Sequence, residues 1–351
     1  MTNSGRTLRA IVMTATVVLA LPVANPAARW AMRATAVTQI PLCDGLTIVT
    51  SVNNAAGDFE SIKRVTRVDS ARVDIAYSAE VPRPDGGVEH LAQVRSVRRS
   101  DLRDAHLYHW NFSGDREIPG STAIGVSTAV LDDLRNAGQT ELSVPAGVEP
   151  GVLTGPLLRV EPTAVPYDVI VNDERTTLSA IHARGRLGRW EFWILDDPAD
   201  PLALQWTLGG TGVRLTVVRI AFPIDRPSEK IARTLATGGR AVVYGIYFDF
   251  GSDHLKPESD VVLAEIAGVL EAHPAWSLAI EGHTDNIGGE SYNLDLSRRR
   301  AAAVKRALAD RYHVDSGRLR ADGFGASRPK DTNETLAGRA RNRRVELVKV
   351  G

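Results

Sequence analysis

The sequence predicts an α+β protein, in which a β-rich, sandwich-like N-terminal region is followed by a two-layer domain of order β-α-β-α-β-β. The 351 residues are enough for about two domains, and the composition, 43% hydrophobic and 24% charged, is that of a folded protein. Between residues 40 and 235, short apolar runs alternate with clusters of Pro, Gly, Asp and Asn, which is typical of many short strands. From about Gly238, runs with strand and helix periodicity alternate instead.

The first 36 residues have the pattern of a signal peptide, which predicts export. Two arginines, at positions 6 and 9, precede the uncharged run Ala10–Val23, which is too short to cross a bilayer but matches the apolar core of a leader. The small residues of Ala34–Ala36 are the best cleavage site, and cleavage nearer Ala24 or Ala28 is the alternative. No other apolar run reaches about eighteen residues, so the sequence predicts no transmembrane helix.

The charge balance and the single cysteine exclude several classes of function. Lys plus Arg total 42 and Asp plus Glu total 42, so the net charge is zero and no global field attracts nucleic acid. Predicted export also argues against a nucleic-acid partner. Cys43 alone forms no internal disulfide and is too few for a thiolate zinc cluster. Leu42 stands where a lipid-modified cysteine needs a small residue, so we expect a lone, buried thiol.

Residues 37–235 are predicted to form one β-rich domain of unknown role. One helix interrupts the strands, running from Thr128 to Ala137, with Ser127 as its N-cap and Gly138 as its stop. The predicted strands are Leu46–Val52, Arg72–Val81, Val88–Val97, His106–Phe112, Tyr167–Val171, Arg189–Leu195 and Val213–Ala221.

Three features of this region resemble catalytic sites but fit ordinary structural roles better. Gly125–Ser127 resembles part of a nucleophile elbow, yet Ala129 stands where the second glycine is needed, and the cap role already accounts for the serine. The two aspartates at 196–197 precede a proline directly after a predicted strand, which indicates a turn rather than paired catalytic carboxylates. The aromatic alternation over residues 190–194 indicates sheet core rather than a sugar site.

Residues 236–351 are predicted to form one compact α/β domain with two helices packed on a sheet. Pro257 suits the first turn of one helix, and Asn293 can cap the other. A polar loop separates the last two strands. The predicted elements are strand Ala241–Phe250, helix Pro257–Ala272, strand Trp276–His283, a helix from Asn293 to about Tyr312, and strands Leu319–Gly323 and Val345–Val350.

Polar side chains gather at one edge of this predicted sheet. The run Glu281–Asp285 ends a strand, and after a glycine-containing loop the next helix begins near Asn293, with Arg300 two turns further along. The run Tyr247–Asp249 ends the first predicted strand at the same edge, and several arginines of residues 339–344 approach from the C-terminal side. Ligands bind at strand ends and helix starts in α/β folds, so we expect one pocket here.

Four separated motifs in this domain carry a family resemblance. In chain order they read YFDFGS, HTDNIGGESYNLDLSRRRAAAV, ADGFGASRP and GRARNRRVEL. Residues 240–351 resemble the OmpA-like peptidoglycan-binding domain, a match that covers under a third of the chain. The resemblance implies noncatalytic binding of the peptide stem of peptidoglycan, with diaminopimelate gripped between Asp285 and Arg300. It also implies that the pocket is lined by Phe248, Asp249, Asn293 and Arg343.

The chemistry of diaminopimelate agrees with the pair Asp285 and Arg300. Its end carries both an ammonium and a carboxylate, so a receptor needs one anion and one planar bidentate donor close together. The charges of the domain are also segregated. Residues 241–290 contain one basic residue against nine acidic, and residues 291–351 contain fifteen against seven. The seam between these halves lies between Asp285 and Arg300.

The charged residues next to this pair are predicted to have structural roles. Arg298 and Arg299 cannot both face that pocket, because neighbours on a helix point about 100° apart, and we expect them to be solvated or paired with acids. Glu281, His283 and Asp285 alternate onto one strand face, but no second His or Cys lies at ligand spacing, so we predict neither a metal nor a cofactor. We expect His283 to be a hydrogen-bonding residue of the sheet.

These features predict a noncatalytic protein of the periplasm, cell wall or outer membrane, whose β-rich domain is anchored to peptidoglycan and meets other envelope proteins. The alternative is an envelope hydrolase whose β-rich domain cuts wall material and whose C-terminal domain only targets it. A flagellar stator subunit would need a true membrane helix carrying an acid, and Ala10–Val23 has neither the length nor the acid.

Overall fold

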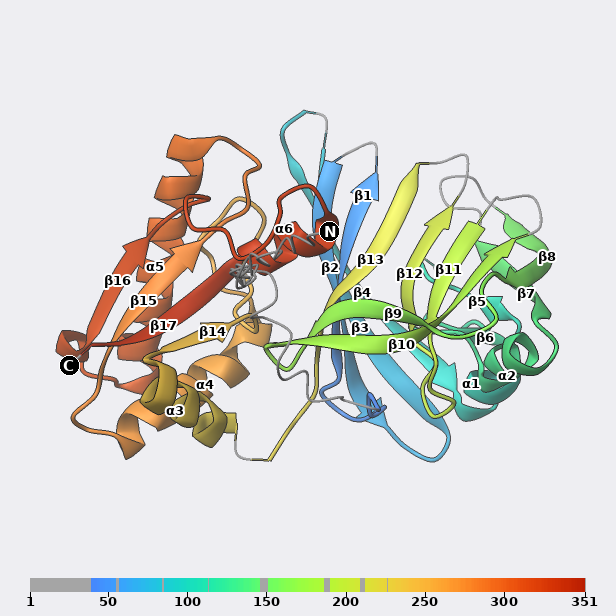
Figure 1. The fold of residues 1–351 in the computed structure, drawn as a ribbon, viewed down its shortest axis with the longest axis horizontal. Coiled ribbons are helices and arrows are strands. Elements are labelled where there is room, and N and C mark those ends of the chain that lie inside the picture. Colours follow the sequence, from blue (N-terminus) through green and yellow to red (C-terminus); the bar gives the residue numbers. More distant parts are fainter. Residues whose placement is uncertain are drawn as a thin grey trace, which may run out of the picture. The chain divides into compact units, whose positions relative to one another are not determined.

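The computed structural model describes residues 39–54, 57–83, 85–112, 114–145, 151–185, 190–208, 212–225 and 227–350 (Figure 1). The predicted signal peptide, residues 1–36, lies outside the described residues, as do its cleavage sites. Residues 35–351 form one compact unit. Within the described ranges, no helix is both long and apolar enough to cross a membrane.

The N-terminal part, residues 39–225, is called the β-rich part because a single sheet of thirteen strands dominates it. Their order is β4-β3-β2-β1-β13-β12-β11-β10-β8-β7-β5-β6, and β9 pairs with both β10 and β13, which closes a ring of five strands. The strands are β1 Thr47–Asn54, β2 Gly57–Val68, β3 Arg72–Pro82, β4 Val88–Arg98, β5 Leu107–Tyr108, β6 Ser121–Thr122, β7 Gln139–Pro145, β8 Val152–Arg159, β9 Val165–Val171, β10 Glu174–Gly185, β11 Trp190–Leu195, β12 Ala203–Leu208 and β13 Val213–Ala221.

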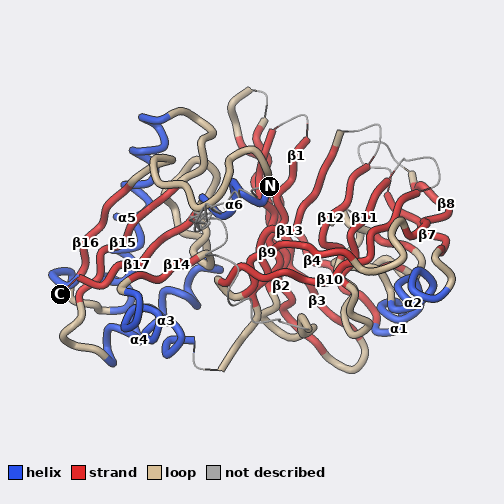
Figure 2. The backbone as a smooth tube through the Cα atoms, in the orientation of Figure 1, coloured by secondary structure: helices blue, strands red, loops and turns tan. Residues whose placement is uncertain are grey.

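Strands that are distant in this order share apolar clusters, so the sheet folds over on itself (Figure 2). One cluster includes Ile75 of β3 and Val169 of β9. The other cluster includes Phe59 of β2, Leu142 of β7 and Trp206 of β12. The predicted β-rich fold class of this part is confirmed. Cys43 is half-buried against the first cluster, so it is less buried than the sequence predicts.

Two short helices, α1 Arg99–Asp104 and α2 Thr128–Asn136, interrupt these strands. The hydroxyl of Ser127 accepts a hydrogen bond from the backbone N–H of Val130 at 3.3 Å, which confirms the predicted N-cap of α2. Gly138 follows with φ of +71°, a conformation that favours glycine and stops the helix.

The seven predicted strands of this part are present, although His106–Phe112 shrinks to β5. The sequence missed β2, β6, β7, β8, β10 and β12, and also α1. In β2 the reason is visible, because Asp58, Glu60 and Lys63 interrupt the apolar pattern on which strand prediction depends. Residue 189, at the start of one predicted strand, lies outside the described residues.

The C-terminal part has its own four-stranded sheet, of order β14-β17-β15-β16, with β15 and β16 parallel. The predicted β-α-β-α-β-β order is confirmed, with helices α3 and α6 added. The elements are α3 Pro227–Gly238, β14 Arg240–Val243, α4 Asp260–Ala272 after a 3-10 turn at Pro257–Ser259, β15 Ser277–His283, α5 Glu290–Tyr312, a 3-10 turn at Ser316–Arg318, β16 Leu319–Gly323, α6 Leu336–Asn342 and β17 Arg344–Val350.

Two predicted boundaries in this part are wrong. The first strand ends at Val243 rather than Phe250, because the following segment turns away and the N–H of Tyr247 donates to the hydroxyl of Ser259 at 2.8 Å instead of to a neighbouring strand. Helix α5 begins at Glu290, so Asn293 lies inside its first turn and is not its cap.

Helix α5 lies flush on strand β15 because Gly282 leaves room for it. A Cβ at Gly282 would lie 2.3 Å from the carbonyl oxygen of Ser297, which no side chain tolerates. Val304 and Leu308 of the same helix pack with Ile280 in a buried apolar cluster. The end of β15 and the first turns of α5 are therefore fixed side by side.

Candidate functional site

Asp285 follows the end of β15 and is buried, with 7% of its surface exposed. One carboxylate oxygen accepts a hydrogen bond from the N–H of Ile287 at 3.0 Å. The other accepts from Nη1 of Arg343 at 2.5 Å. The carboxylate is thus held in one orientation by its own loop and by Arg343, the residue before β17.

Asn293 holds the loop that carries Asp285. It is 2% exposed, and its Nδ2 donates to the carbonyl oxygens of Asp285 at 3.1 Å and Ile287 at 2.9 Å. Both of its amide protons are therefore donated to the backbone of the loop. The structure places Asn293 beside Asp285, in a position to orient it.

Arg300 lies two turns along α5 from Asn293, and its guanidinium is oriented without a counter-ion. Nε donates to the carbonyl oxygen of Ser252 at 2.8 Å, and Nη2 donates to that of Asp249 at 3.3 Å. The guanidinium carbon lies 4.9 Å from the ring centre of Phe248, a cation–π distance. Among the described residues, no carboxylate forms an ion pair with Arg300, and burial lowers its pKa to about 10.

Asp249 meets Arg300 through its backbone rather than its side chain. Its carboxylate contacts Nδ1 of His254 at 2.7 Å and Nζ of Lys256 at 3.2 Å. Burial favours the neutral acid, but hydrogen bonding with Glu80 and Lys256 lowers the pKa of Asp249 below its ordinary value. The structure brings Phe248, Asp249 and Arg300 together, with the Asp249 carboxylate turned to other partners.

Arg343 connects this site to the β-rich part. Nη1 donates to Asp285, and Nη2 donates to Oε1 of Glu60 in β2 at 2.5 Å. Burial would lower the pKa of Arg343, but Glu60 and Asp285 raise it above its ordinary value. Sequence reasoning missed Glu60, because it lies 283 residues before its partner and the alternating charges of β2 do not identify that partner.

The neighbouring arginines of α5 behave as predicted. Arg299 donates to Asp295 at 2.8 Å, four residues earlier, and to Asp253 at 2.8 Å. Arg298 is exposed. Only Arg300 of the three is directed to the segment that carries Phe248 and Asp249.

The expectation that His283 hydrogen-bonds in the sheet is wrong. The side chain is 3% exposed, and neither ring nitrogen has a hydrogen-bond partner among the described residues. The ring stacks on Phe324 with 5.5 Å between centroids. Burial and the nearby Arg344 lower the pKa of His283 to about 3, so the ring is neutral.

Glu281, His283 and Glu346 offer ligand atoms within 4.8 Å of one another, a spacing that a metal ion could use. However, Arg240 donates to Glu281 at 2.6 Å and also to Glu346. Arg344 donates to Glu346 at 2.6 Å. Two guanidinium groups thus already neutralise the two carboxylates, and a cation would have to displace them.

The features of the β-rich part that resemble catalytic groups have structural roles. Asp196 pairs with Arg135 at 2.6 Å, and Asp197 accepts from the N–H of Ala199 at 2.9 Å within the predicted turn. The aromatic residues of β11 at positions 190 and 192 are at most 5% exposed, as predicted for sheet core. The turn and the sheet core therefore account for these residues.

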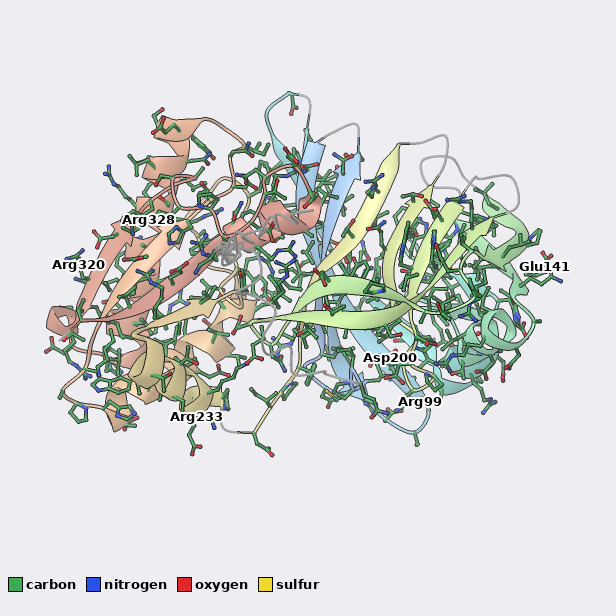
Figure 3. The ribbon with its side chains drawn as sticks, in the orientation of Figure 1. Arg99, Glu141, Asp200, Arg233, Arg320 and Arg328 are labelled. Carbon is green, nitrogen blue, oxygen red and sulfur yellow. The ribbon has the colours of Figure 1, made fainter. Side chains whose placement is uncertain are left out.

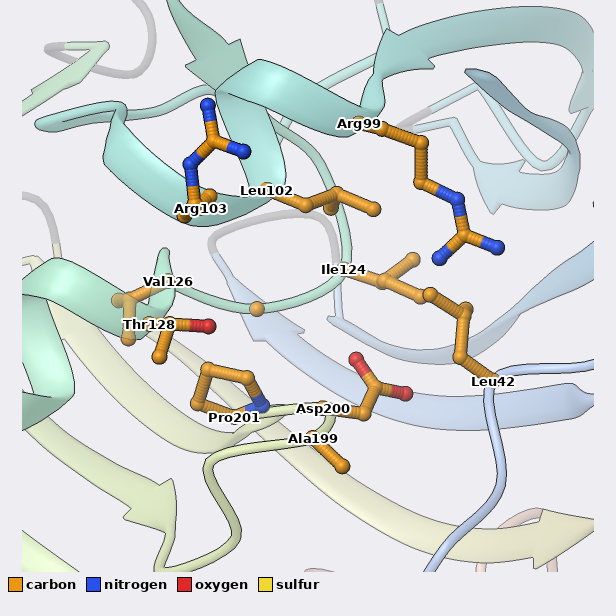
Figure 4. A pocket seen from close by; sticks show the side chains of 11 residues that line it. Leu42, Arg99, Leu102, Arg103, Ile124, Val126, Thr128, Ala199, Asp200 and Pro201 are labelled. Atoms are coloured by element: carbon orange, nitrogen blue, oxygen red, sulfur yellow. The ribbon is translucent and has the colours of Figure 1, made fainter. Parts of the chain in front are cut away.

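A cavity of about 170 Å³ lies in the β-rich part, far along the chain from the proposed pocket. Asp200 points into it from the turn between β11 and β12, with Arg99 on another wall (Figure 4). Figure 3 labels both residues within the β-rich part, and Arg320 and Arg328 in the C-terminal part. The described residues that line this cavity include no Ser, Cys or His.

A second cavity, of about 390 Å³, lies between the Ser252–Leu255 segment and the second half of α5. Its lining includes Asp253, Arg306 and Arg311. Ser252 lines this cavity and also supplies the carbonyl that holds Arg300. This second cavity therefore lies next to Arg300, one of the residues of the proposed site.

The fold and motifs of the C-terminal part define an OmpA-like domain. Residues 247–343 match the model of the OmpA family, as the resemblance predicted. Outer membrane porin F of Pseudomonas aeruginosa is 44% identical over 101 residues, 29% of this chain and 29% of that protein. Outer membrane protein A of Bordetella avium is 43% identical over 129 residues, 36% of this chain and 64% of that protein. The match thus spans less than two thirds of each relative.

Among solved structures, the peptidoglycan-associated lipoprotein from Burkholderia pseudomallei is similar, with 35% sequence identity. The match covers 30% of this chain and 88% of that chain, with a TM-score of 0.28.

Proposed function

We propose that residues 240–351 bind peptidoglycan without catalysis, through the diaminopimelate of its stem peptide, and so anchor the exported β-rich part to the cell wall. The observation that carries the proposal is the oriented guanidinium of Arg300, which has no counter-ion among the described residues. The buried carboxylate of Asp285 lies close enough to act on the charge of Arg300. One anion and one planar donor are the pair that a zwitterion requires.

The two charges of the ligand have separate partners in this arrangement. The ligand carboxylate accepts from the free N–H groups of Arg300, whose plane is set by Phe248 and two backbone carbonyls. The ligand ammonium donates to Asp285, since two carboxylate oxygens offer about four acceptor sites and the structure uses two. Asn293 orients Asp285, and Asp249 orients Arg300.

The names of the relatives support an envelope location. Porin F and outer membrane protein A are named for the outer membrane, and a probable lipoprotein of Escherichia coli is 39% identical over 103 residues. We infer that this chain works in the same compartment, in the periplasm, in the wall or at the outer membrane, with the β-rich part free to meet other envelope proteins.

Pull-down with isolated sacculi tests the binding site. We expect the double variant Asp285→Ala, Arg300→Ala to lose at least about tenfold in affinity, a cost of about 1.4 kcal/mol. Arg300→Lys keeps the charge but loses the planar fork, so its affinity for sacculi should lie between that of the wild type and that of the double variant. Arg299→Ala is the matched control, because Arg299 pairs with Asp295 and Asp253 on the same helix. Undiminished binding by the double variant would overturn the site.

Two further measurements test the ligand and the absence of catalysis. Sacculi that carry lysine in place of diaminopimelate lack the second carboxylate, so we expect weaker binding to them. Equal binding to both kinds of sacculus would show that another part of the wall is recognised. Zymography on wall material should give no clearing, and clearing that depends on residues 37–235 would favour the hydrolase alternative.

A further inference from the structure

The outer face of strand β2 combines acidic and apolar side chains and contacts the proposed wall-binding part. Asp58, Glu60 and Ile62 share this face, because side chains two residues apart point to the same side of a strand. Ile62 lies in one buried apolar cluster with Tyr247 and Ala340. These two partners flank the proposed site in the sequence, at the residue before Phe248 and three residues before Arg343.

Glu60 engages the guanidinium that also holds Asp285. Oε1 of Glu60 accepts from Arg343 at 2.5 Å, and Oε2 accepts from Arg219 of β13. Burial alone would raise the pKa of Glu60, but Arg219 and Arg343 lower it to about 2, so the group is anionic at neutral pH. Glu60 also acts electrostatically on Arg300. A carboxylate of the chain itself thus acts on the guanidinium, that of Arg300, which would receive the carboxylate of a ligand.

Two more acids of the β-rich part hold segments on either side of this contact. Asp58 pairs with Arg339 of α6 at 2.5 Å. Glu80 of β3 pairs with Lys256 at 2.6 Å and accepts a hydrogen bond from the N–H of Phe250. Three acids on β2 and β3 therefore meet three bases around the proposed site. The two sides of this contact therefore carry opposite charges, as two partners in a complex do.

We propose that Glu60 is an internal ligand of the wall-binding site and that peptidoglycan binds only when β2 has moved away from Arg343. The inference rests on the proposed function. A guanidinium has five N–H donors in one plane, and both terminal nitrogens of Arg343 already donate to Glu60 and Asp285. The resemblance places Arg343 in the pocket lining beside Arg300, so an anionic group of the ligand that reaches Arg343 competes with Glu60 for its positive charge. We call the fraction of molecules in which β2 has moved away from Arg343 the open fraction. The measured association constant of the full chain is the intrinsic constant multiplied by this open fraction.

The first test is Glu60→Gln in the full chain, measured by sacculus pull-down. Glutamine keeps the size of the side chain but removes the charge, so the open fraction rises and we expect about tenfold tighter binding. Glu141→Gln is the matched control, because Glu141 is an exposed strand residue of β7. Unchanged or weaker binding by a folded Glu60→Gln variant would overturn the proposal.

A second test holds the contact closed and does not require Glu60 to be replaced. In a Cys43→Ser background, the substitutions Asp58→Cys and Arg339→Cys provide two thiols that a short bismaleimide linker joins. We expect the linked protein to lose sacculus binding while the same double variant without linker binds at least as well as the wild type. Equal binding by linked and unlinked protein would show that the site works while closed.

The two proposals fail in distinguishable ways. If the variant Asp285→Ala, Arg300→Ala binds sacculi as the wild type does, the wall-binding site itself is wrong. If that variant loses binding while the linked and unlinked proteins bind equally, the site stands and only the competition by Glu60 is wrong.

Discussion

Two buried charges, one from each part of the molecule, show how pairing decides ionisation. In the C-terminal part, Glu346 is 2% exposed but bonds to Arg240 and Arg344, which outweigh its burial and lower its pKa to about 2. In the β-rich part, Lys63 is 3% exposed and lies 4.9 Å from the ring centre of Trp206, with no ion pair among the described residues. Burial lowers the pKa of Lys63 to about 7.

Asp200 of the β-rich part is a second lone buried charge. One of its oxygens has no hydrogen-bond partner among the described residues, and burial, with the nearby Asp197, raises its pKa to about 8. Paired carboxylates such as Glu346 and Glu60 stay ionised at neutral pH, whereas burial shifts the pKa of a lone group toward its neutral form. The β-rich part places these two lone groups inside its apolar packing, whereas its acids that contact the C-terminal part, Asp58, Glu60 and Glu80, are paired.

Trp206→Ala should give the largest effect, because it removes the centre of that apolar packing. Trp206 is fully buried in the core shared by β2, β7 and β12, edge-on to Tyr108 at 5.5 Å. We expect the free energy of unfolding to fall by about 3–5 kcal/mol in urea titration. Trp276→Ala in the C-terminal part is the comparison. Trp276 is half-buried and stacks on His273 at 4.0 Å, so a loss as large as that at Trp206 would contradict the contrast.

Gly282→Ala should give the next largest effect and should act on the site. The new Cβ would lie 2.3 Å from the carbonyl oxygen of Ser297, so α5 must move away from β15. We expect a cost of about 1–3 kcal/mol in unfolding and a clear loss of sacculus binding, since Asp285 and Arg300 stand on the two elements that separate. The control is Gly268→Ala in α4.

At Gly268 the nearest atom to a new Cβ is 3.5 Å away, so alanine should stabilise the helix by about 0.5–1 kcal/mol. Binding that survives Gly282→Ala would show that the spacing of α5 and β15 does not set the site.

Features that depend on neighbouring residues could be predicted from the sequence, whereas features that depend on contacts between distant residues could not. The alternation of Leu263, Ile266 and Leu270 is local, so α4 could be predicted, and the four motifs predicted the C-terminal fold. Glu60 could not be found, because its role depends on β2 meeting Arg343 across 283 residues. The hydrogen-bonding role expected for His283 is wrong for a related reason, since nothing in a strand pattern shows that its ring faces Phe324 rather than a hydrogen-bond partner.

Asp200→Asn should change the pH dependence of stability. A carboxyl whose folded pKa is raised binds its proton more tightly in the folded state. Its contribution is complete below the ordinary value of 3.8 and is lost as the pH rises through about 8. We expect the wild type to lose about 1.4 kcal/mol per pH unit within this window relative to the variant.

Urea unfolding of the wild type and Asp200→Asn at pH 5, 6, 7 and 8 measures this difference. Parallel curves would show that Asp200 is ionised when folded, which would remove one of the two lone charges from the comparison.

The smallest effects should come from the helix caps, one in each part. The hydroxyl of Ser127 accepts from Val130 N–H at 3.3 Å at the start of α2, and that of Thr335 accepts from Gly338 N–H at 3.0 Å at the start of α6. Each change to alanine should cost about 1 kcal/mol, because a helix-end donor loses its partner. Hydrogen exchange should localise the loosening to α2 in one variant and to α6 in the other. Since α6 carries Arg339, which pairs with Asp58, only Thr335→Ala should also speed exchange in β2. Equal exchange in β2 for both variants would show that α6 and β2 open independently.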